Sequence, residues 1–172
     1  MKHRFTFIIH LWLLILGMLL ASCTIKYSFT GTSIAPDITT FTIHDFPNTA
    51  PLYVPTLSAT FTEMLKDKIL TQTSLQHTSQ NGDLEFEGAI TGYRIVPISV
   101  QGNETASASR LTITIKVKYT NRKDHKQDFE RNFSNYADFD SSQDIADIEQ
   151  ELIEEILDKI TDDIYNNTLA NW

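Results

Sequence analysis

The sequence predicts a two-layer α+β domain in which two helices pack on one face of a four-stranded, largely antiparallel sheet. Two segments repeat apolar residues at intervals of three and four, which is the spacing of an amphipathic helix. Other segments alternate apolar and polar residues, as strands with one buried and one solvated face do. The predicted order of elements is β-α-β-β-β-α, and two layers of this kind enclose one common core.

The first part of the domain contains one strand, a proline-rich loop and one helix. Residues 39–45 alternate aromatic or aliphatic with polar side chains and are predicted to form a strand. Three prolines between positions 47 and 55 predict an extended loop, because proline is excluded from most positions inside helices and sheets. A helix is expected over residues 56–73, and Thr60 and Glu63 have the spacing of a capping box.

The middle of the chain contains the long strands. Residues 84–98 are predicted to form a strand whose apolar positions change parity after Gly92, which indicates a β-bulge there. Residues 111–120 show the most regular alternation in the chain, with aliphatic residues and tyrosine on one face and threonine and lysine on the other. A polar turn then leads to a partner strand that carries Phe129 and Phe133.

The last helix is predicted to begin near Gln143, with Ser141 or Ser142 as its N-cap. Its apolar stripe consists of Ile145, Ile148, Leu152, Ile156, Ile160 and Ile164. Acidic residues cover the rest of this helix, against the single cation Lys159. A charged surface opposite an apolar stripe is more typical of a solvated face than of paired catalytic carboxylates.

Residues 1–22 are predicted to be a lipoprotein signal peptide. Lys2 and Arg4 precede an apolar run that is shorter than the roughly 20 residues of a membrane-spanning helix. The run ends in Leu20, Ala21, Ser22 and Cys23, which resembles a bacterial lipobox. The alternatives are an uncleaved anchor helix or a chance cysteine after an ordinary signal peptide.

In the lipobox interpretation, the thiol of Cys23 is acylated and Cys23 becomes the new amino terminus. Three acyl chains, each contributing about 0.8 kcal/mol per buried methylene, hold a protein firmly on a membrane. Residues 23–36 are then expected to be a lipidated tether, and residues 37–172 a single domain.

Composition excludes several classes of function. Without residues 1–22 the chain has 12 basic and 22 acidic side chains, so general nucleic-acid binding is not expected. Cys23 is the only cysteine, and no histidine–cysteine cluster has metal-ligand spacing. Nucleotide-binding and hydrolase motifs are absent from the sequence. We therefore expect no metal, no cofactor beyond the covalent lipid on Cys23, and no enzymatic activity; a hydrolase that uses sheet carboxylates is a minor alternative.

A basic cluster stands out in this acidic chain. Lys116 and Lys118 lie on the polar face of the most regular strand, and Arg122 lies in the turn after it. These cations are candidates for contact with phosphates or with an acidic partner. The competing interpretation is edge protection, because lysines on an exposed strand discourage pairing between sheets.

The chain also resembles a known family over nearly all of its mature length. The segments that carry the resemblance are residues 23–34, 46–48, 57–63, 82–93, 110–119, 163–166 and 171–172. In content and order they are similar to the lipopolysaccharide-assembly lipoproteins of the LptE family, in the form found in Bacteroidetes. Each segment is a signature of the fold rather than a reactive motif.

The resemblance implies a non-enzymatic outer-membrane lipoprotein whose domain faces the periplasm and the lumen of an LptD-type β-barrel. LptE-like proteins plug that barrel and take part in lipopolysaccharide transport and assembly at the cell surface. By charge alone, Lys116, Lys118 and Arg122 become candidate lipopolysaccharide contacts. We expect the sheet and its loops to face the substrate, and the acidic helix to face the barrel wall or solvent. The alternative function is a periplasmic lipoprotein adaptor of another outer-membrane machine.

Overall fold

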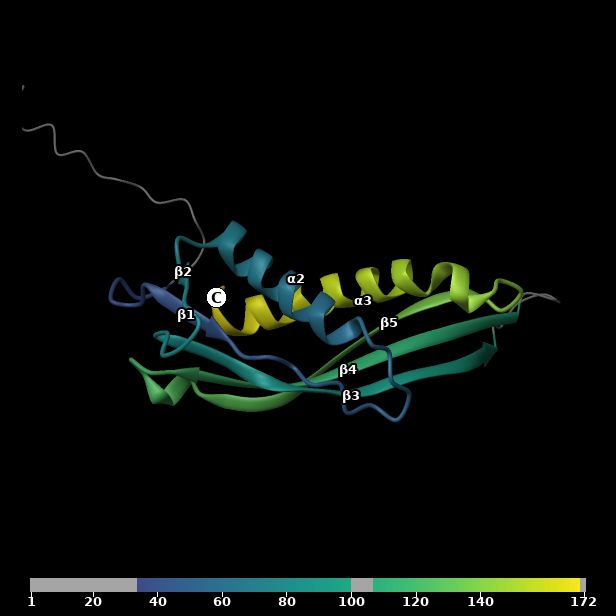
Figure 1. Cartoon of the computed structure of the whole chain (residues 1–172), viewed down its shortest axis with the longest axis horizontal. Coiled ribbons are helices and arrows are strands. Elements are labelled where there is room, and N and C mark those ends of the chain that lie inside the picture. Colours follow the sequence, from purple (N-terminus) through teal and green to yellow (C-terminus); the bar gives the residue numbers. More distant parts are fainter. Residues whose placement is uncertain (1–33, 100–106, 171–172) are drawn as a thin grey trace, which may run out of the picture. The chain divides into compact units, whose positions relative to one another are not determined.

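In the computed structural model, one mixed sheet carries two helices on the same face (Figure 1). The structure describes residues 34–99 and 107–170. Their strands are β1 (Thr40–Ile43), β2 (Gln76–His77), β3 (Leu84–Ser99), β4 (Ser107–Asn121) and β5 (Phe129–Asp140). The helices are α2 (Leu57–Gln72) and α3 (Ile145–Thr168), and η1 (His125–Gln127) is a short 3-10 turn.

The sheet has the order β2-β1-β3-β4-β5. The predicted α+β class is confirmed, but the described part of the chain contributes five strands, so the expected number of four was wrong. The additional strand, β2, has only two residues and is too short to show a period in the sequence. β1 runs parallel to both β2 and β3, while β4 runs antiparallel to both of its neighbours, β3 and β5. The parallel pairing of β1 with β3 is possible because α2 provides the crossover between them.

β3 and β4 are the longest strands of the sheet and pair with each other along nearly their whole length. Ile90 pairs with Ile115 and Gly92 with Thr114, so Thr91 is the extra residue of a bulge. This confirms the irregularity predicted from the parity change. Beyond the bulge Tyr93 is buried, whereas Ile95 is 37% exposed. Its cross-strand partner Leu111 is fully buried, so burial on this face decreases from β4 toward β3.

Strands β4 and β5 place one face against the helices. Every second residue of β4 from Leu111 to Tyr119 is buried, as the alternation predicted. In β5 the buried residues are Phe133 and Ala137, and the strand continues to Asp140.

Helix α2 contributes Leu57, Phe61, Leu65 and Ile69 to the core. The predicted capping box was wrong, because Thr60 lies inside the helix and its hydroxyl donates a hydrogen bond to the carbonyl of Thr56 at 3.0 Å. Glu63 instead forms an ion pair with Lys66 in the next turn.

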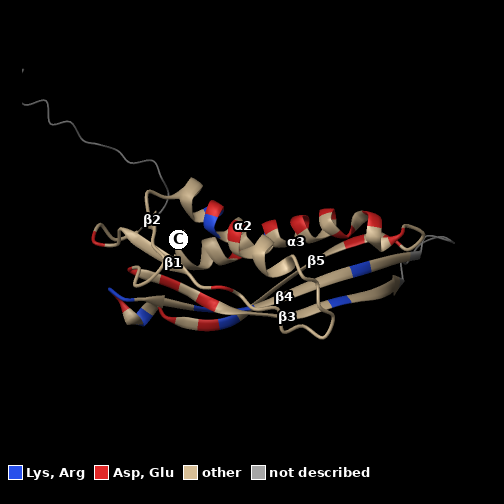
Figure 2. Ribbon diagram, viewed as in Figure 1, with Lys and Arg blue, Asp and Glu red and all other residues tan. Residues whose placement is uncertain are grey.

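Helix α3 buries its predicted stripe from Leu152 to Ile164, and Ile145 and Ile148 pack at its start. Its N-cap is Asp144, whose carboxylate accepts a hydrogen bond from the backbone N–H of Ala146 at 3.0 Å. The predicted serine caps were therefore wrong by two or three residues. The acidic residues of α3 are visible along its outer side in Figure 2.

The two helices are tied together by Lys68, whose Nζ lies 3.1 Å from Asp158 and 2.7 Å from Asp162. Neither α2 nor α3, among the residues that are described, is long and apolar enough to cross a membrane. The predicted signal peptide, the lipobox with Cys23 and most of the tether lie outside the described residues. Ile34, near the end of the predicted tether, packs against the core together with Ile38.

Candidate functional site: the open face of the sheet and a pocket at its end

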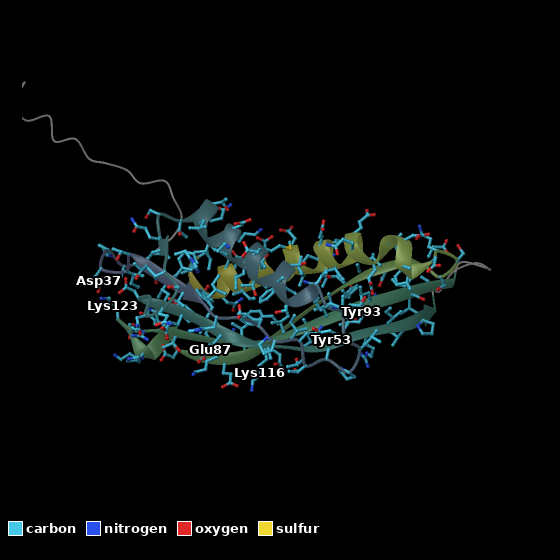
Figure 3. The ribbon with its side chains drawn as sticks, viewed as in Figure 1. Asp37, Tyr53, Glu87, Tyr93, Lys116 and Lys123 are labelled. Carbon is cyan, nitrogen blue, oxygen red and sulfur yellow. The ribbon has the colours of Figure 1, made fainter. Side chains whose placement is uncertain are left out.

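The three basic residues that the sequence singled out lie on or beside the sheet face opposite the helices. Lys116 and Lys118 alternate with buried residues of β4, and Arg122 follows the last residue of that strand. Their side chains are 50%, 53% and 44% exposed. Figure 3 shows Lys116 and Glu87 projecting from the side of the sheet that the helices leave open.

Each of these cations is paired with a carboxylate from elsewhere in the sheet. Lys118 pairs with Glu87 across the β3–β4 register, and Lys116 pairs diagonally with Glu130 of β5. The Arg122 guanidinium lies 2.8 Å from Glu85. A fourth pair joins Lys123 to Asp83 at 3.1 Å. We call these four ion pairs the charged ladder.

Pairing in the ladder favours the charged forms of Lys118 and Glu130. The neighbouring Glu87 carboxylate raises the pKa of Lys118, and the Lys116 ammonium lowers the pKa of Glu130. Sheet positions of both signs are intermixed along β3–β5 (Figure 2), so this face is not a purely basic patch. Exposed ion pairs of this kind contribute little to stability, so an incoming anion can replace the carboxylates at low cost.

The topology also decides between the two interpretations of the lysines. β4 lies between β3 and β5 and is not an edge strand. Edge protection therefore does not explain Lys116 and Lys118, and that alternative was wrong. Their remaining structural role is the cross-strand pairing described above.

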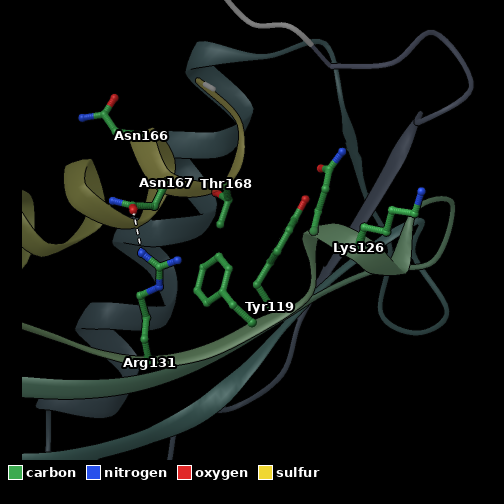
Figure 4. Close-up of a pocket in the computed structure, with 8 residues that line it drawn as sticks. Tyr119, Lys126, Arg131, Asn166, Asn167 and Thr168 are labelled. Atoms are coloured by element: carbon green, nitrogen blue, oxygen red, sulfur yellow. Dashed lines mark hydrogen bonds between the residues drawn. The ribbon is translucent and has the colours of Figure 1, made fainter. Parts of the chain in front are cut away.

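A pocket of about 480 Å³ lies at the end of the sheet, between the β4–β5 connection and the last turn of α3 (Figure 4). We call it the end pocket. Its lining includes Tyr119, Lys126, Phe129, Arg131, Asn167 and Thr168. Lys126 comes from η1 and Arg131 from β5, on either side of Tyr119 in the view of Figure 4.

Arg131 was not among the sequence candidates. It lies two residues from both Phe129 and Phe133 in β5, so the alternation of side chains along a strand places it on the same, helix-facing side of the sheet. A cation at an inward position of an amphipathic strand was the signal that could have identified it. Lys126 lies in η1, in the polar turn between β4 and β5. The described residues contain no group of three or more histidine, cysteine, aspartate or glutamate side chains that could hold a metal ion.

The fold and these two features define a class of protein: a small α+β domain that presents one open, charge-paired sheet face and a polar pocket at the end of that sheet. Comparison with known families makes the assignment specific. The family model described as LptE, lipopolysaccharide-assembly, matches residues 38–168. The chain belongs to the LptE family, and this membership gives it a role in lipopolysaccharide assembly.

At least one solved structure shares the fold of this chain. A hypothetical protein from Chlamydia trachomatis matches with a TM-score of 0.53 and 7% identity, over 77% of this chain and 99% of that one. A minor lipoprotein from Acinetobacter baumannii has a TM-score of 0.47 and 17% identity, over 77% and 96% of the two chains. Rare lipoprotein B from Shewanella oneidensis has a TM-score of 0.47 and 11% identity, over 74% and 92%. No curated protein matches the sequence significantly.

Proposed function

We propose that this chain is a non-enzymatic outer-membrane lipoprotein that partners and plugs an LptD-type β-barrel during lipopolysaccharide transport to the cell surface. The observation that carries the proposal is the LptE family match over residues 38–168, which begins 15 residues after the lipobox cysteine Cys23. A lipid anchor followed directly by one domain suits a protein that must stay beside a partner in the same membrane.

The anchor is tested by metabolic labelling with palmitate. We expect the wild-type protein to take up label and to sediment with outer membranes, and Cys23→Ala to do neither. Because Cys23 is the only cysteine in the chain, label that persists in the variant would contradict lipidation at this site.

The partner is tested by purification of the full-length protein from outer membranes in detergent through a C-terminal tag. Recovery of an LptD-type barrel in a ratio near one to one supports the proposal. Recovery of a different barrel supports the alternative, a lipoprotein adaptor of another outer-membrane machine. Recovery of no barrel by folded, lipidated protein would contradict both.

The charged ladder is the proposed lipopolysaccharide-facing surface, with Lys116, Lys118 and Arg122 as contacts. Its test is lipopolysaccharide binding by the double variant Lys116→Glu/Lys118→Glu, with Arg122→Glu measured separately. The matched control, Lys66→Glu/Lys159→Glu, makes the same change of charge on the helices. We expect weaker binding for the ladder variants than for the control, and unchanged binding would remove these residues from the site.

A further inference from the structure

The end pocket is where the described residues leave positive charge uncompensated. Of the 11 lysines and arginines that the structure describes, eight pair with a described carboxylate. The other three are Arg94, Lys126 and Arg131, and two of these line the end pocket. In a domain with an excess of acidic side chains, two such cations in one concave site indicate affinity for an anion.

The guanidinium of Arg131 is held in place from two directions. Its carbon lies 4.1 Å from the centre of the Phe129 ring, and its Nη1 donates a 2.9 Å hydrogen bond to the Asn167 side-chain oxygen. A guanidinium has five N–H donors, and this contact uses one of them. Arg131 is therefore oriented by the ring and the amide, while most of its donors remain available to a ligand.

Lys126 adds a second, more flexible charge from η1 at the rim of the pocket. Its Nζ makes no ion pair with any carboxylate in the described part of the chain. A guanidinium fork matches two oxygens of a phosphoryl or carboxylate group, and an ammonium binds phosphate as a point charge. The two cations together favour a tetrahedral group with three oxygens over a planar carboxylate.

The remaining walls indicate what the anionic group is attached to. Gln127, Asn166 and Asn167 bring amide groups, and Tyr119 and Phe129 bring aromatic rings. A volume of about 480 Å³ lies within the range of small-molecule sites, roughly 300–1,000 Å³, and exceeds the need of a phosphate alone. Amides beside aromatic rings suit a ligand with hydroxyl groups on a compact ring.

We propose that the end pocket binds a phosphomonoester carried on a polyhydroxylated ring, with Arg131 and Lys126 as the phosphoryl ligands. The source of this ligand is a phosphorylated glycolipid rather than a free sugar phosphate. On this one point the proposal rests on the proposed function. Affinity for the phosphorylated group itself depends only on the pocket.

The test is calorimetric titration of the full-length lipidated protein in detergent. The soluble probes are glucose 1-phosphate, inorganic phosphate, glucuronate and glucose, and the lipid probes are diphosphorylated and dephosphorylated lipid A. We expect glucose 1-phosphate to bind more tightly than inorganic phosphate or glucuronate, and glucose not to bind. Diphosphorylated lipid A should bind more tightly than its dephosphorylated form, and should compete with glucose 1-phosphate.

Arg131→Gln and Lys126→Gln should each weaken glucose 1-phosphate binding about tenfold or more, which corresponds to loss of one charge-assisted contact. The matched control is Lys159→Gln, which removes the same charge from a position on α3 that does not line the pocket and should bind as the wild type does. Binding should also weaken as ionic strength rises, because both cations are open to solvent.

Three results would overturn the proposal: no binding of glucose 1-phosphate to the wild type, binding unaffected by both pocket variants, or an equal loss in Lys159→Gln. Tight binding of glucose 1-phosphate without competition by diphosphorylated lipid A would overturn the glycolipid source alone. The proposed function is tested separately, by identifying the barrel that is purified with the protein. The pocket proposal and the proposed function can therefore fail independently.

Discussion

The carboxylate of Asp83 accepts a hydrogen bond from the backbone N–H of Thr40 at 3.0 Å, which fastens the beginning of β1 to the residue before β3. The same oxygen accepts a bond from the N–H of Thr39 at 2.9 Å, and Lys123 pairs with the other carboxylate oxygen at 3.1 Å. The hydrogen bond from the backbone N–H of Thr39 is the main reason that the pKa of Asp83 lies below its ordinary value of 3.8. Lys123 and Thr40 lower this pKa further.

Asp83→Ala should destabilise the domain by about 2–4 kcal/mol, because the backbone N–H groups of Thr39 and Thr40 lose their acceptor. Chemical denaturation at pH 7 measures the change. Asp45→Ala is the control, since Asp45 is exposed and should change stability by less than about 0.5 kcal/mol. Equal effects of the two substitutions would contradict the role of Asp83.

The lowered pKa of Asp83 also predicts a pH dependence. Its stabilising contribution is complete above the unfolded-state value near 3.8 and is lost as the pH falls below that value through the folded-state pKa. We expect wild-type stability to fall more steeply than that of Asp83→Ala over this acidic range. Parallel curves for the two proteins would show that Asp83 is not the group responsible.

Gly88 marks a close approach between β3 and β4. A Cβ at this position would lie 1.9 Å from the Lys116 carbonyl oxygen, and a backbone atom cannot move aside by rotation. Gly88→Ala should therefore cost about 1–3 kcal/mol or more in the free energy of unfolding. Gly92→Ala is the control, because its nearest contact would be 3.1 Å from Thr114 Cβ, and we expect a smaller loss in thermal denaturation.

Tyr93 links β3 to α3 through its hydroxyl, which donates a 2.7 Å hydrogen bond to Glu149. Burial and the neighbouring Glu149 carboxylate raise the pKa of this phenol. Tyr93→Phe should lower stability by about 1–2 kcal/mol, because it removes the hydroxyl and keeps the ring. The exposed Tyr136 provides the control: Tyr136→Phe should leave the denaturation midpoint nearly unchanged.

The charged ladder should contribute little to stability. Lys118→Ala removes an exposed pair with Glu87 and should leave the free energy of unfolding nearly unchanged. A lipopolysaccharide-binding defect in a ladder variant would then report a lost contact rather than an unfolded domain. A clear fall of the denaturation midpoint in Lys118→Ala would contradict this separation of binding from stability.

The spacing of apolar residues along the chain was sufficient to predict the strands and helices that pack one continuous face against the core. The alternation from Leu111 to Tyr119 identified the buried side of β4, and the parity change located the bulge near Gly92. Helix starts were less predictable, because several neighbouring polar residues could each cap the helix. Only the hydrogen bonds of the folded structure show that Asp144 caps α3 and that Thr60 lies inside α2. Strand β2 could not be predicted, because two residues have no period.

The sequence by itself determined the α+β class, the amphipathic faces and the resemblance to the LptE family, and it predicts a lipobox at Cys23, because these depend on local order along the chain. Only the tertiary structure decided that β4 is an interior strand, that Lys116 and Lys118 are paired with glutamates, and that Arg131 and Lys126 share a pocket. Strand order, cross-strand register and the position of the end of α3 are set by contacts between distant residues, and local periodicity does not encode those contacts.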